Sequence, residues 1–273
     1  MGISGVPFPF GLSFVPTEAL GPVVGVPRAP AADLAEACAT LGASFAFVPA
    51  EVPWAAEAVG ALAEASVAPL VAFSGPLWPV IRARGITSGL RATLLQPEQI
   101  GVELDDGIDE LVAGIGRAAE WGARAVVLAE DLAGSEGPLV APDFAIAELV
   151  PRYARVVEAA RAEGLPAVFH SDGDIRALLL AIVRAGFVAV HGGGGLGFDG
   201  FERLFDAARS SGLAVMGGLL TTELVSPVRA EVIGSMVGVL AHGGGLFVAD
   251  DGGITTPREV ANLVTALAAA RDL

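Results

Sequence analysis

The stretch "RAEGLPAVFHSDGD", residues 161–174, contains the pattern that decides the fold. A helical segment ends at Gly164, an apolar run follows over 165–169, and the run stops at His170, where polar residues begin. Glycine is typical of a helix C-terminus, and a short apolar run bounded in this way is typical of a buried strand. The stretch therefore predicts a helix, a strand and a polar loop, in that order.

The same unit recurs along the chain. Its apolar runs predict strands at 22–26, 44–48, 69–73, 124–129, 166–170, 187–191, 213–217 and 245–249. Strands that alternate with helices favour a parallel sheet, and eight such units are typical of a closed (β/α)₈ barrel, the TIM barrel. A doubly wound open sheet is the alternative, but the turn after the first expected strand, "VPRAPAADL", contains no glycine. We therefore predict a single barrel domain over residues 1–273.

One connection is longer than a barrel needs. Between the strands expected at 69–73 and 124–129, a helix from Asp109 to Trp121 is enough, so residues 74–95 are an insertion. Long loops of this kind are usually functional. The apolar residues Leu77, Trp78 and Ile81 predict a lid or the contact of a homodimer, and a variable surface insertion is the alternative.

Composition excludes several classes of protein. The net charge of −15 would repel nucleic acid and anionic membranes. No apolar run reaches the roughly 18 residues that span a bilayer, and the N-terminus lacks a signal-peptide pattern. The single cysteine, Cys38, excludes an internal disulfide. We expect a cytoplasmic protein with a small-molecule substrate.

Polar side chains follow each expected strand, at the end where barrel enzymes have their active sites. These residues are Arg28, Glu51, Ser74, Glu130, Asp131, His170, Asp172, His191, Thr221, Thr222, Glu223, Asp250 and Asp251. Two of the three histidines end a strand, whereas His242 precedes the last strand and is expected at the opposite face. Asp174 is interpreted as a helix cap. The glycines after His191 are either an anion-binding turn or a close-packed turn.

Four stretches together resemble a known family. They are "EDLAGSEGPLVAPDF" (130–144), "LVPRYARVVEAARAEGLPAVFHSDGDI" (149–175), "GGLLTTELVSP" (217–227) and "GGGLFVADDGGITTPREVANLVTAL" (243–267). The chain resembles the uroporphyrinogen decarboxylase superfamily as a divergent member, clearly over 124–267 and more weakly over 33–52, and within it the corrinoid-dependent methyltransferases. The resemblance implies a (β/α)₈ barrel, and it implies either decarboxylation or methyl transfer.

The chain departs from both branches. Decarboxylases have an arginine-rich N-terminal segment, but Arg28 is the first basic residue here, and Glu51 stands where they have an essential aspartate. The methyltransferases hold zinc with a His-x-Cys pair and a later cysteine; these positions are His170-x-Asp172 and Asp250 or Asp251 here. Zinc with sulfur ligands is thereby excluded. His170, Asp172, His191 and Asp251 remain as nitrogen and oxygen ligands for Zn²⁺, Mn²⁺ or Fe²⁺. Because clustered carboxylates disfavour one another's ionised forms, we expect at least one of them to have a raised pKa when no cation is bound, and His170 to be held protonated.

Three functions follow as hypotheses. The first is a methyltransferase-like enzyme that acts on a corrinoid protein or a small methylated substrate. The second is a lyase that decarboxylates a porphyrinogen or a smaller carboxylate with Glu51 as the acid, and the third is a non-catalytic barrel that binds a tetrapyrrole or a partner protein. The expected catalytic residues are His170, Asp172 and Glu51. The expected substrate-binding residues are Arg28, Asp131, His191 and Thr222.

Overall fold

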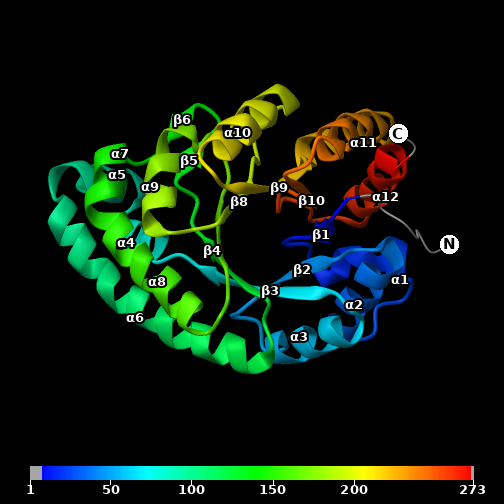
Figure 1. The fold of residues 1–273 in the computed structure, drawn as a ribbon, viewed down its shortest axis with the longest axis horizontal. Coiled ribbons are helices and arrows are strands. Elements are labelled where there is room, and N and C mark those ends of the chain that lie inside the picture. Colours follow the sequence, from blue (N-terminus) through cyan, green and yellow to red (C-terminus); the bar gives the residue numbers. More distant parts are fainter. Residues whose placement is uncertain (1–7, 272–273) are drawn as a thin grey trace.

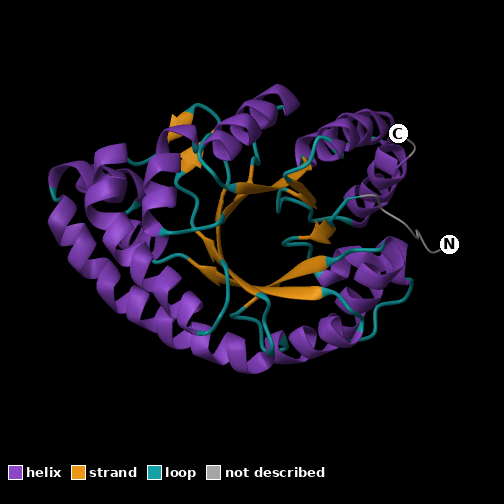
Figure 2. Ribbon diagram, in the orientation of Figure 1, coloured by secondary structure: helices purple, strands orange, loops and turns teal. Residues whose placement is uncertain are grey.

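The computed structural model describes residues 8–271 and contains a closed barrel of parallel strands surrounded by helices (Figures 1 and 2). Around the barrel the strand order is β1-β10-β9-β8-β7-β4-β3-β2. The barrel strands are β1 (Phe10–Leu12), β2 (Phe45–Pro49), β3 (Ala68–Ser74), β4 (Ala125–Ala129), β7 (Ala167–Ser171), β8 (Ala189–Gly192), β9 (Ala214–Leu219) and β10 (Leu246–Asp250). The (β/α)₈ fold that the sequence predicts is confirmed.

Helices connect the strands and form the outer layer (Figure 2). They are α1 (Gly21–Val24), α2 (Pro30–Leu41), α3 (Ala55–Glu64), α4 (Leu77–Ala83), α5 (Ile86–Leu95), α6 (Pro97–Trp121), α7 (Pro142–Phe144), α8 (Val150–Ala162), α9 (Leu179–Ala185), α10 (Phe198–Ser210), α11 (Pro227–His242) and α12 (Pro257–Arg271). A small hairpin, β5 (Ala133–Gly134) and β6 (Gly137–Pro138), follows β4 outside the barrel. No helix in the described part of the chain combines the length and the hydropathy needed to cross a membrane.

The first strand is the one error in the strand assignment. Residues 22–26 belong to the short helix α1 and the turn that ends it. The first strand is β1, which begins twelve residues before the expected start of the strand. Pro22 lies at the first turn of α1, where its missing N–H costs nothing, and Gly25 ends that helix with a φ of +76°. β1 closes the barrel because Gly11 pairs with Ala249 on one side and with Phe45 on the other. A Cβ at Gly11 would lie 2.2 Å from the Phe45 ring, so only glycine fits there.

The insertion at 74–95 is helical. It contains α4 and α5, which pack beside the long helix α6 (Figure 1). Leu77 and Ile81 are buried by the chain itself, and Trp78 is half-buried. These residues therefore need no second copy to cover them, and the homodimer stays a prediction.

The barrel interior holds its own apolar cluster, separate from the larger core between the strands and the helices. The interior cluster includes Phe47, Val127, Val168, Ala189 and Met216. Since side chains alternate between the two faces of a strand, His170 and His191, two residues after Val168 and Ala189, also face the interior. The strand pattern thus places both imidazoles at the carboxyl end of the barrel.

Candidate metal centre and active site

His170 and His191 form a pair at the mouth of the barrel. Their strands, β7 and β8, are neighbours, and the two residues face each other in register. The Nδ1 atoms lie 2.7 Å apart, and His191 Nε2 lies 2.9 Å from the backbone oxygen of Asp250. The aromatic rings of Phe14 and Phe47 cover the pair, with centroid distances of 5.1 Å from Phe14 to His170 and 4.8 Å from Phe47 to His191.

Burial keeps both imidazoles neutral. It lowers the pKa of His170 to about 4 and lowers the pKa of His191 well below its usual range, where the neighbouring His170 adds to the effect. The sequence predicted that His170 would be held protonated by the surrounding carboxylates. That prediction is wrong, because the loss of solvent around the buried ring outweighs the attraction of the acids.

The tautomers follow from the hydrogen bonds. A backbone oxygen only accepts, so His191 carries its proton on Nε2 and donates it to Asp250. The Nδ1 atom of neutral His191 must then accept from His170, which carries its own proton on Nδ1. The Nε2 atom of His170 is therefore left with a lone pair directed away from His191. Such a nitrogen is suited to bind a metal ion, with the second histidine fixing its tautomer.

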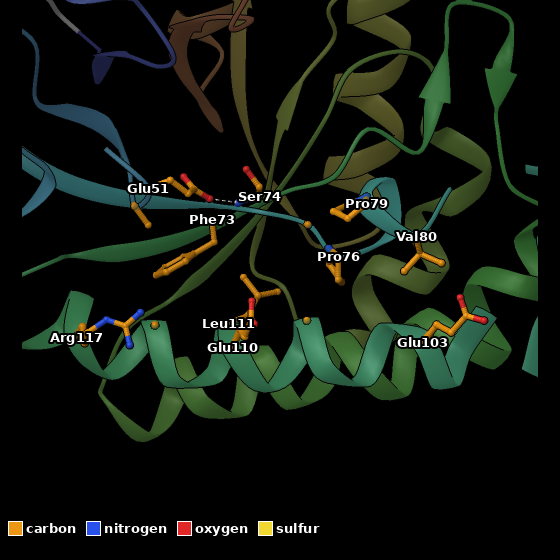
Figure 3. Close-up of a pocket in the computed structure, with 14 residues that line it drawn as sticks. Glu51, Phe73, Ser74, Pro76, Pro79, Val80, Glu103, Glu110, Leu111 and Arg117 are labelled. Carbon is orange, nitrogen blue, oxygen red and sulfur yellow. Dashed lines mark hydrogen bonds between the residues drawn. The ribbon is translucent and has the colours of Figure 1, made fainter. Parts of the chain in front are cut away.

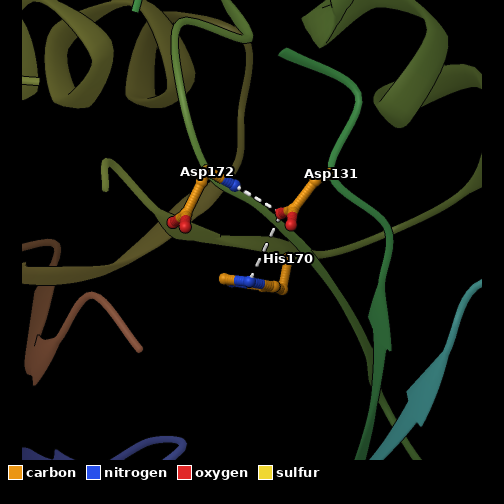
Figure 4. A group of neighbouring side chains, drawn as sticks. All are labelled: Asp131, His170 and Asp172. Atoms are coloured by element: carbon orange, nitrogen blue, oxygen red, sulfur yellow. Dashed lines mark hydrogen bonds and ion pairs between the residues drawn. The ribbon is translucent and has the colours of Figure 1, made fainter. Parts of the chain in front are cut away.

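Two carboxylates converge on this nitrogen. Asp131 Oδ1 lies 3.7 Å from His170 Nε2 and accepts a hydrogen bond from the backbone N–H of Asp172 at 2.9 Å. Figure 4 shows both carboxylates on the same side of the His170 ring. One ligand atom from each of Asp131, His170 and Asp172 lies within 4.8 Å of the other two.

Asp172 is a carboxyl group with a strongly shifted pKa. Burial raises its pKa to about 7, and the charges of Asp131 and Asp251 add to the shift. Its Oδ1 atom is buried and has no hydrogen-bond partner within residues 8–271. The sequence predicted a raised carboxyl pKa in this cluster, and that prediction is confirmed.

The glycines after His191 make room for this acid. A Cβ on Gly194 would lie 2.3 Å from Asp172 Oδ1, and a Cβ on Gly192 would lie 2.0 Å from the backbone oxygen of Ser171. Gly192 has a φ of +142°, which other residues rarely adopt. Of the two interpretations of this segment, an anion-binding turn and a close-packed turn, the geometry favours the close-packed turn.

The three residues could hold a divalent cation. The lone-pair nitrogen of His170 and one oxygen each of Asp172 and the half-exposed Asp131 lie within 4.8 Å of one another, and the buried Asp172 Oδ1 has no donor within residues 8–271. Nitrogen and oxygen ligands suit Zn²⁺, Mn²⁺ or Fe²⁺, and three protein ligands leave coordination positions for water or substrate. A cation there would also offset the repulsion that raises the pKa of Asp172.

The other expected ligands are engaged elsewhere. Both ring nitrogens of His191 take part in the hydrogen bonds described above, so this residue orients His170. Asp251 accepts hydrogen bonds from the backbone N–H of Thr221, at 3.0 Å, and from the Thr221 hydroxyl, which ties the end of β10 to the end of β9. Thr222 is exposed. Asp131, expected to bind substrate, is one of the three residues that could hold a metal ion, and its role in substrate binding stays a prediction.

Glu51 and Arg28 lie outside the group of Asp131, His170 and Asp172. Glu51 accepts a hydrogen bond from the backbone N–H of Ser74 at 2.9 Å and lines a cavity of about 490 Å³ between β3 and α6 (Figure 3), which adjoins the cavity over His170 at Ser74, Gly75 and Pro79. Arg28 pairs with Asp33 and Glu36 of α2. Its expected place at the mouth followed from the wrong first strand. The structure does not bring either residue to the cluster of Asp131, His170 and Asp172.

The correct first strand places Ser13 and Phe14 at the mouth instead. Ser13 donates to Asp250 from both its backbone N–H and its hydroxyl. Phe14 lines a cavity of about 310 Å³ together with Trp78, Arg82, Asp131 and His170. The sequence signal for these residues was the run "FGLSF", which resembles a strand only if Gly11 is accepted within it. The α4 residues Trp78 and Arg82 show that the insertion forms one wall of this cavity.

No known protein-family profile matches the sequence, and no curated protein matches it. Among solved structures, the chain is similar to a methyltransferase from Methanosarcina mazei, with a TM-score of 0.69 and 18% identity over 98% of this chain and 94% of that one. It is also similar to an L-ribulose 3-epimerase, with a TM-score of 0.52 and 14% identity over 96% of this chain and 91% of that one. At these identities the likeness shows the barrel fold alone. Membership of the uroporphyrinogen decarboxylase superfamily stays a prediction.

Proposed function

We propose that this barrel is a metal-dependent enzyme of the methyl-transfer type, with the ion held by Asp131, His170 and Asp172. The observation that carries the proposal is the convergence of the His170 Nε2 lone pair and the unpartnered Asp172 oxygen beside Asp131. The barrel shared with a methyltransferase agrees with it. So does the sequence resemblance, because His170 and Asp172 occupy the positions of two ligands in the corrinoid-dependent methyltransferases.

The chain's own residues would divide the work. A bound divalent ion lowers the pKa of a coordinated hydroxyl or thiol and so supplies a nucleophile at neutral pH. In methyl transfer such a nucleophile would take the methyl carbon of a methylated corrinoid or a small methyl donor, and the electron pair of the broken bond would stay on the donor atom. His191 holds His170 in the ligating tautomer. Phe14 excludes water from the imidazoles, and Trp78 and Arg82 bind substrate in the adjoining cavity.

Metal binding is tested first. The purified chain is treated with chelator, and Mn²⁺ and Zn²⁺ are titrated separately by calorimetry into the wild type, His170→Ala and His242→Ala. We expect one site in the wild type and in His242→Ala, and none in His170→Ala. Equal binding by all three proteins would contradict the proposed centre, and an absence of binding to the wild type would favour a non-catalytic barrel.

Methyl transfer is tested separately. Methylcobalamin and a small thiol are incubated with the metal-loaded protein, and loss of the methyl–cobalt bond is followed by absorbance. We expect demethylation that depends on His170 and on the added metal. A metal-loaded protein that leaves methylcobalamin unchanged at high concentration would count against a corrinoid donor while leaving the metal centre intact.

A lyase is the second candidate, and Asp172 is the residue that favours it. With its pKa raised to about 7, this carboxyl group can give or take a proton near neutral pH. The acid expected from the sequence, Glu51, lines the adjoining cavity and not the one over His170 itself, whereas Asp172 lies beside His170. We therefore assign the acid of a decarboxylase to Asp172. Release of CO₂ from a candidate acid, abolished by Asp172→Asn and unaffected by Glu51→Gln, would favour the lyase over methyl transfer.

A further inference from the structure

A further cavity opens at the other end of the barrel. Its volume is about 460 Å³, and Ser44, Arg124, Pro166 and Val188, which directly precede four of the strands, form its opening. Inward-facing side chains, each from a different strand, form its walls. They are Phe45, Leu70, Val168, Ala189, Met216 and Phe247. The cavity is therefore the lower interior of the barrel, at the amino ends of the strands.

Small side chains leave this space unfilled by residues 8–271. TIM barrels usually fill their interior with layers of bulky branched residues. Here Ala68, Ala189 and Ala214 take inward positions in the lower layers. The lower cavity is separated from the metal centre by little more than one layer, since Val168 and Ala189 precede His170 and His191 by two residues and the Phe47 ring packs under His191.

The lower opening is apolar and carries a single cation. Val188 and Phe247 are 51% and 39% exposed there, and apolar side chains around a cavity opening are typical of a ligand site. Arg124 is the one charged residue among those that line the cavity. Within residues 8–271 no carboxylate lies within 4.0 Å of its guanidinium, unlike the guanidinium groups of Arg84 and Arg152. A guanidinium beside an apolar cavity is suited to an anionic head group.

We propose that this cavity binds an unbranched aliphatic carboxylate. The alkyl chain fills the lower barrel between Phe45, Met216 and Phe247, and the carboxylate pairs with Arg124 at the opening. The volume lies in the range of roughly 300–1,000 Å³ that is usual for small-molecule sites. The net charge of −15 repels anions from most of the surface, so that the bound head group depends on Arg124. This site is independent of the proposed metal centre.

The first test is a chain-length series on the full-length protein. Octanoate, decanoate and 1-decanol are titrated by calorimetry at concentrations below micelle formation. Each added methylene should strengthen binding roughly fourfold, the equivalent of about 0.8 kcal/mol, until the cavity is full. Decanoate should bind several times more tightly than 1-decanol. Full-length protein that shows no saturable binding of decanoate would overturn the proposal, as would equal affinity for the acid and the alcohol.

Two pairs of variants locate the ligand. Ala214→Leu fills the cavity and should weaken decanoate binding at least tenfold, whereas Ala113→Leu, on the exposed face of α6, should leave it unchanged. Arg124→Gln should weaken decanoate about tenfold and leave 1-decanol unchanged, and Arg91→Gln on α5 is its control. If Ala214→Leu and Ala113→Leu bind decanoate equally, or if Arg124→Gln and Arg91→Gln do, the assigned site is wrong.

A fluorescent reporter covers the case in which Ala214→Leu folds poorly. Phe247→Trp places an indole at the partly exposed wall of the cavity. Decanoate should shift its emission to shorter wavelength, because the alkyl chain displaces water from the ring. The wild type, with Trp54, Trp78 and Trp121 only, should show no such shift. An unchanged emission from Phe247→Trp at saturating decanoate would place the ligand elsewhere.

Discussion

The two ends of the barrel interior have opposite chemistry, although the same strands form both. At the amino ends, Val168, Ala189 and Met216 line an apolar cavity. One inward position later, β7 and β8 present His170 and His191, and the loops that follow supply Asp131 and Asp172. The upper end is polar and rich in acceptors, whereas the lower end has Arg124 as its one charged lining residue.

The difference shows how a barrel separates two tasks along its axis. A strand advances about 3.3 Å per residue, so consecutive inward positions lie some 7 Å apart and experience different surroundings. Burial under Phe14 and Phe47 sets the protonation of the histidines. One layer below, the lining of the lower cavity is uncharged except for Arg124 at its opening. Substitutions at one end should therefore leave the other unchanged.

The largest effect is expected for Asp172→Asn at the upper end. The variant keeps the shape of the side chain and removes one ligand charge, so affinity for Mn²⁺ should fall at least a hundredfold, beyond the range of about 10–100-fold for partners that only orient a ligand. Without metal the variant should be more stable than the wild type, since repulsion from Asp131 and Asp251 disappears. Calorimetry and thermal unfolding in chelator measure the two changes. A variant that binds metal normally would remove Asp172 from the centre.

His191→Phe comes next. Phenylalanine fills the space against Phe47 but accepts no hydrogen bond, so the Nδ1 proton of His170 loses its partner and the tautomer is no longer fixed. We expect metal affinity to fall about 10–100-fold, as is usual when a residue that hydrogen-bonds to a metal ligand is replaced. His191→Gln, which can still accept from His170, should restore part of the loss. Decanoate binding at the lower end should not change; if it does, the two ends are coupled.

A smaller effect concerns pH and the buried carboxyl group of Asp250. Burial raises its pKa from 3.8 to about 6. The folded state then holds a proton that the unfolded state has lost, so this group's contribution to stability falls as pH rises from about 4 to 6 and stays low above that. Asp250→Asn keeps the backbone oxygen that His191 uses. Between pH 4.5 and 7, the free energy of unfolding of the wild type should fall by about 2 kcal/mol more than that of Asp250→Asn.

Urea unfolding of both proteins in chelator at several pH values measures this difference. Asp172 also has a raised pKa and keeps its own pH dependence in both proteins, so that the comparison isolates Asp250. Parallel pH profiles for the wild type and Asp250→Asn would show that Asp250 remains ionised in the fold.

The smallest effect is expected for His242→Ala, because His242 belongs neither to the proposed metal centre nor to the lining of the lower cavity. His242 is exposed at the end of α11, and its Nδ1 lies 2.7 Å from the backbone oxygen of Gly238. Surface substitutions of this kind change stability by about 0.5 kcal/mol or less. Metal affinity should equal that of the wild type. A loss of metal binding in this variant would mean that ions bind to the surface and not to the proposed centre.

Seven of the barrel strands were predicted from the sequence to within two residues at most boundaries, because a buried parallel strand is a short apolar run with a clear end. β1 was missed because it is three residues long and contains Gly11. Its position is decided by partners on two sides, Phe45 and Ala249, which are distant in the sequence. Because of this error Arg28 was expected at the end of a strand, whereas it lies between the helices α1 and α2.

For the candidate site, the sequence by itself determined which strands end in polar residues, and hence that His170, Asp172 and Asp131 lie at the carboxyl end of the barrel. It determined this because alternation along a strand is local. Only the tertiary structure decided which of those residues converge. His191 turns its nitrogens to His170 and Asp250, Asp251 turns to Thr221, and Glu51 faces Ser74.

Side-chain direction at a strand end depends on the neighbouring strand and loop, and sequence spacing does not record it. The lower cavity was beyond prediction for the same reason. Each alanine in it is unremarkable in its own strand, and the empty volume arises only when the closed sheet brings Ala68, Ala189 and Ala214 around one axis. The residue types were fixed by the chain, and the space between them was fixed by closure of the barrel.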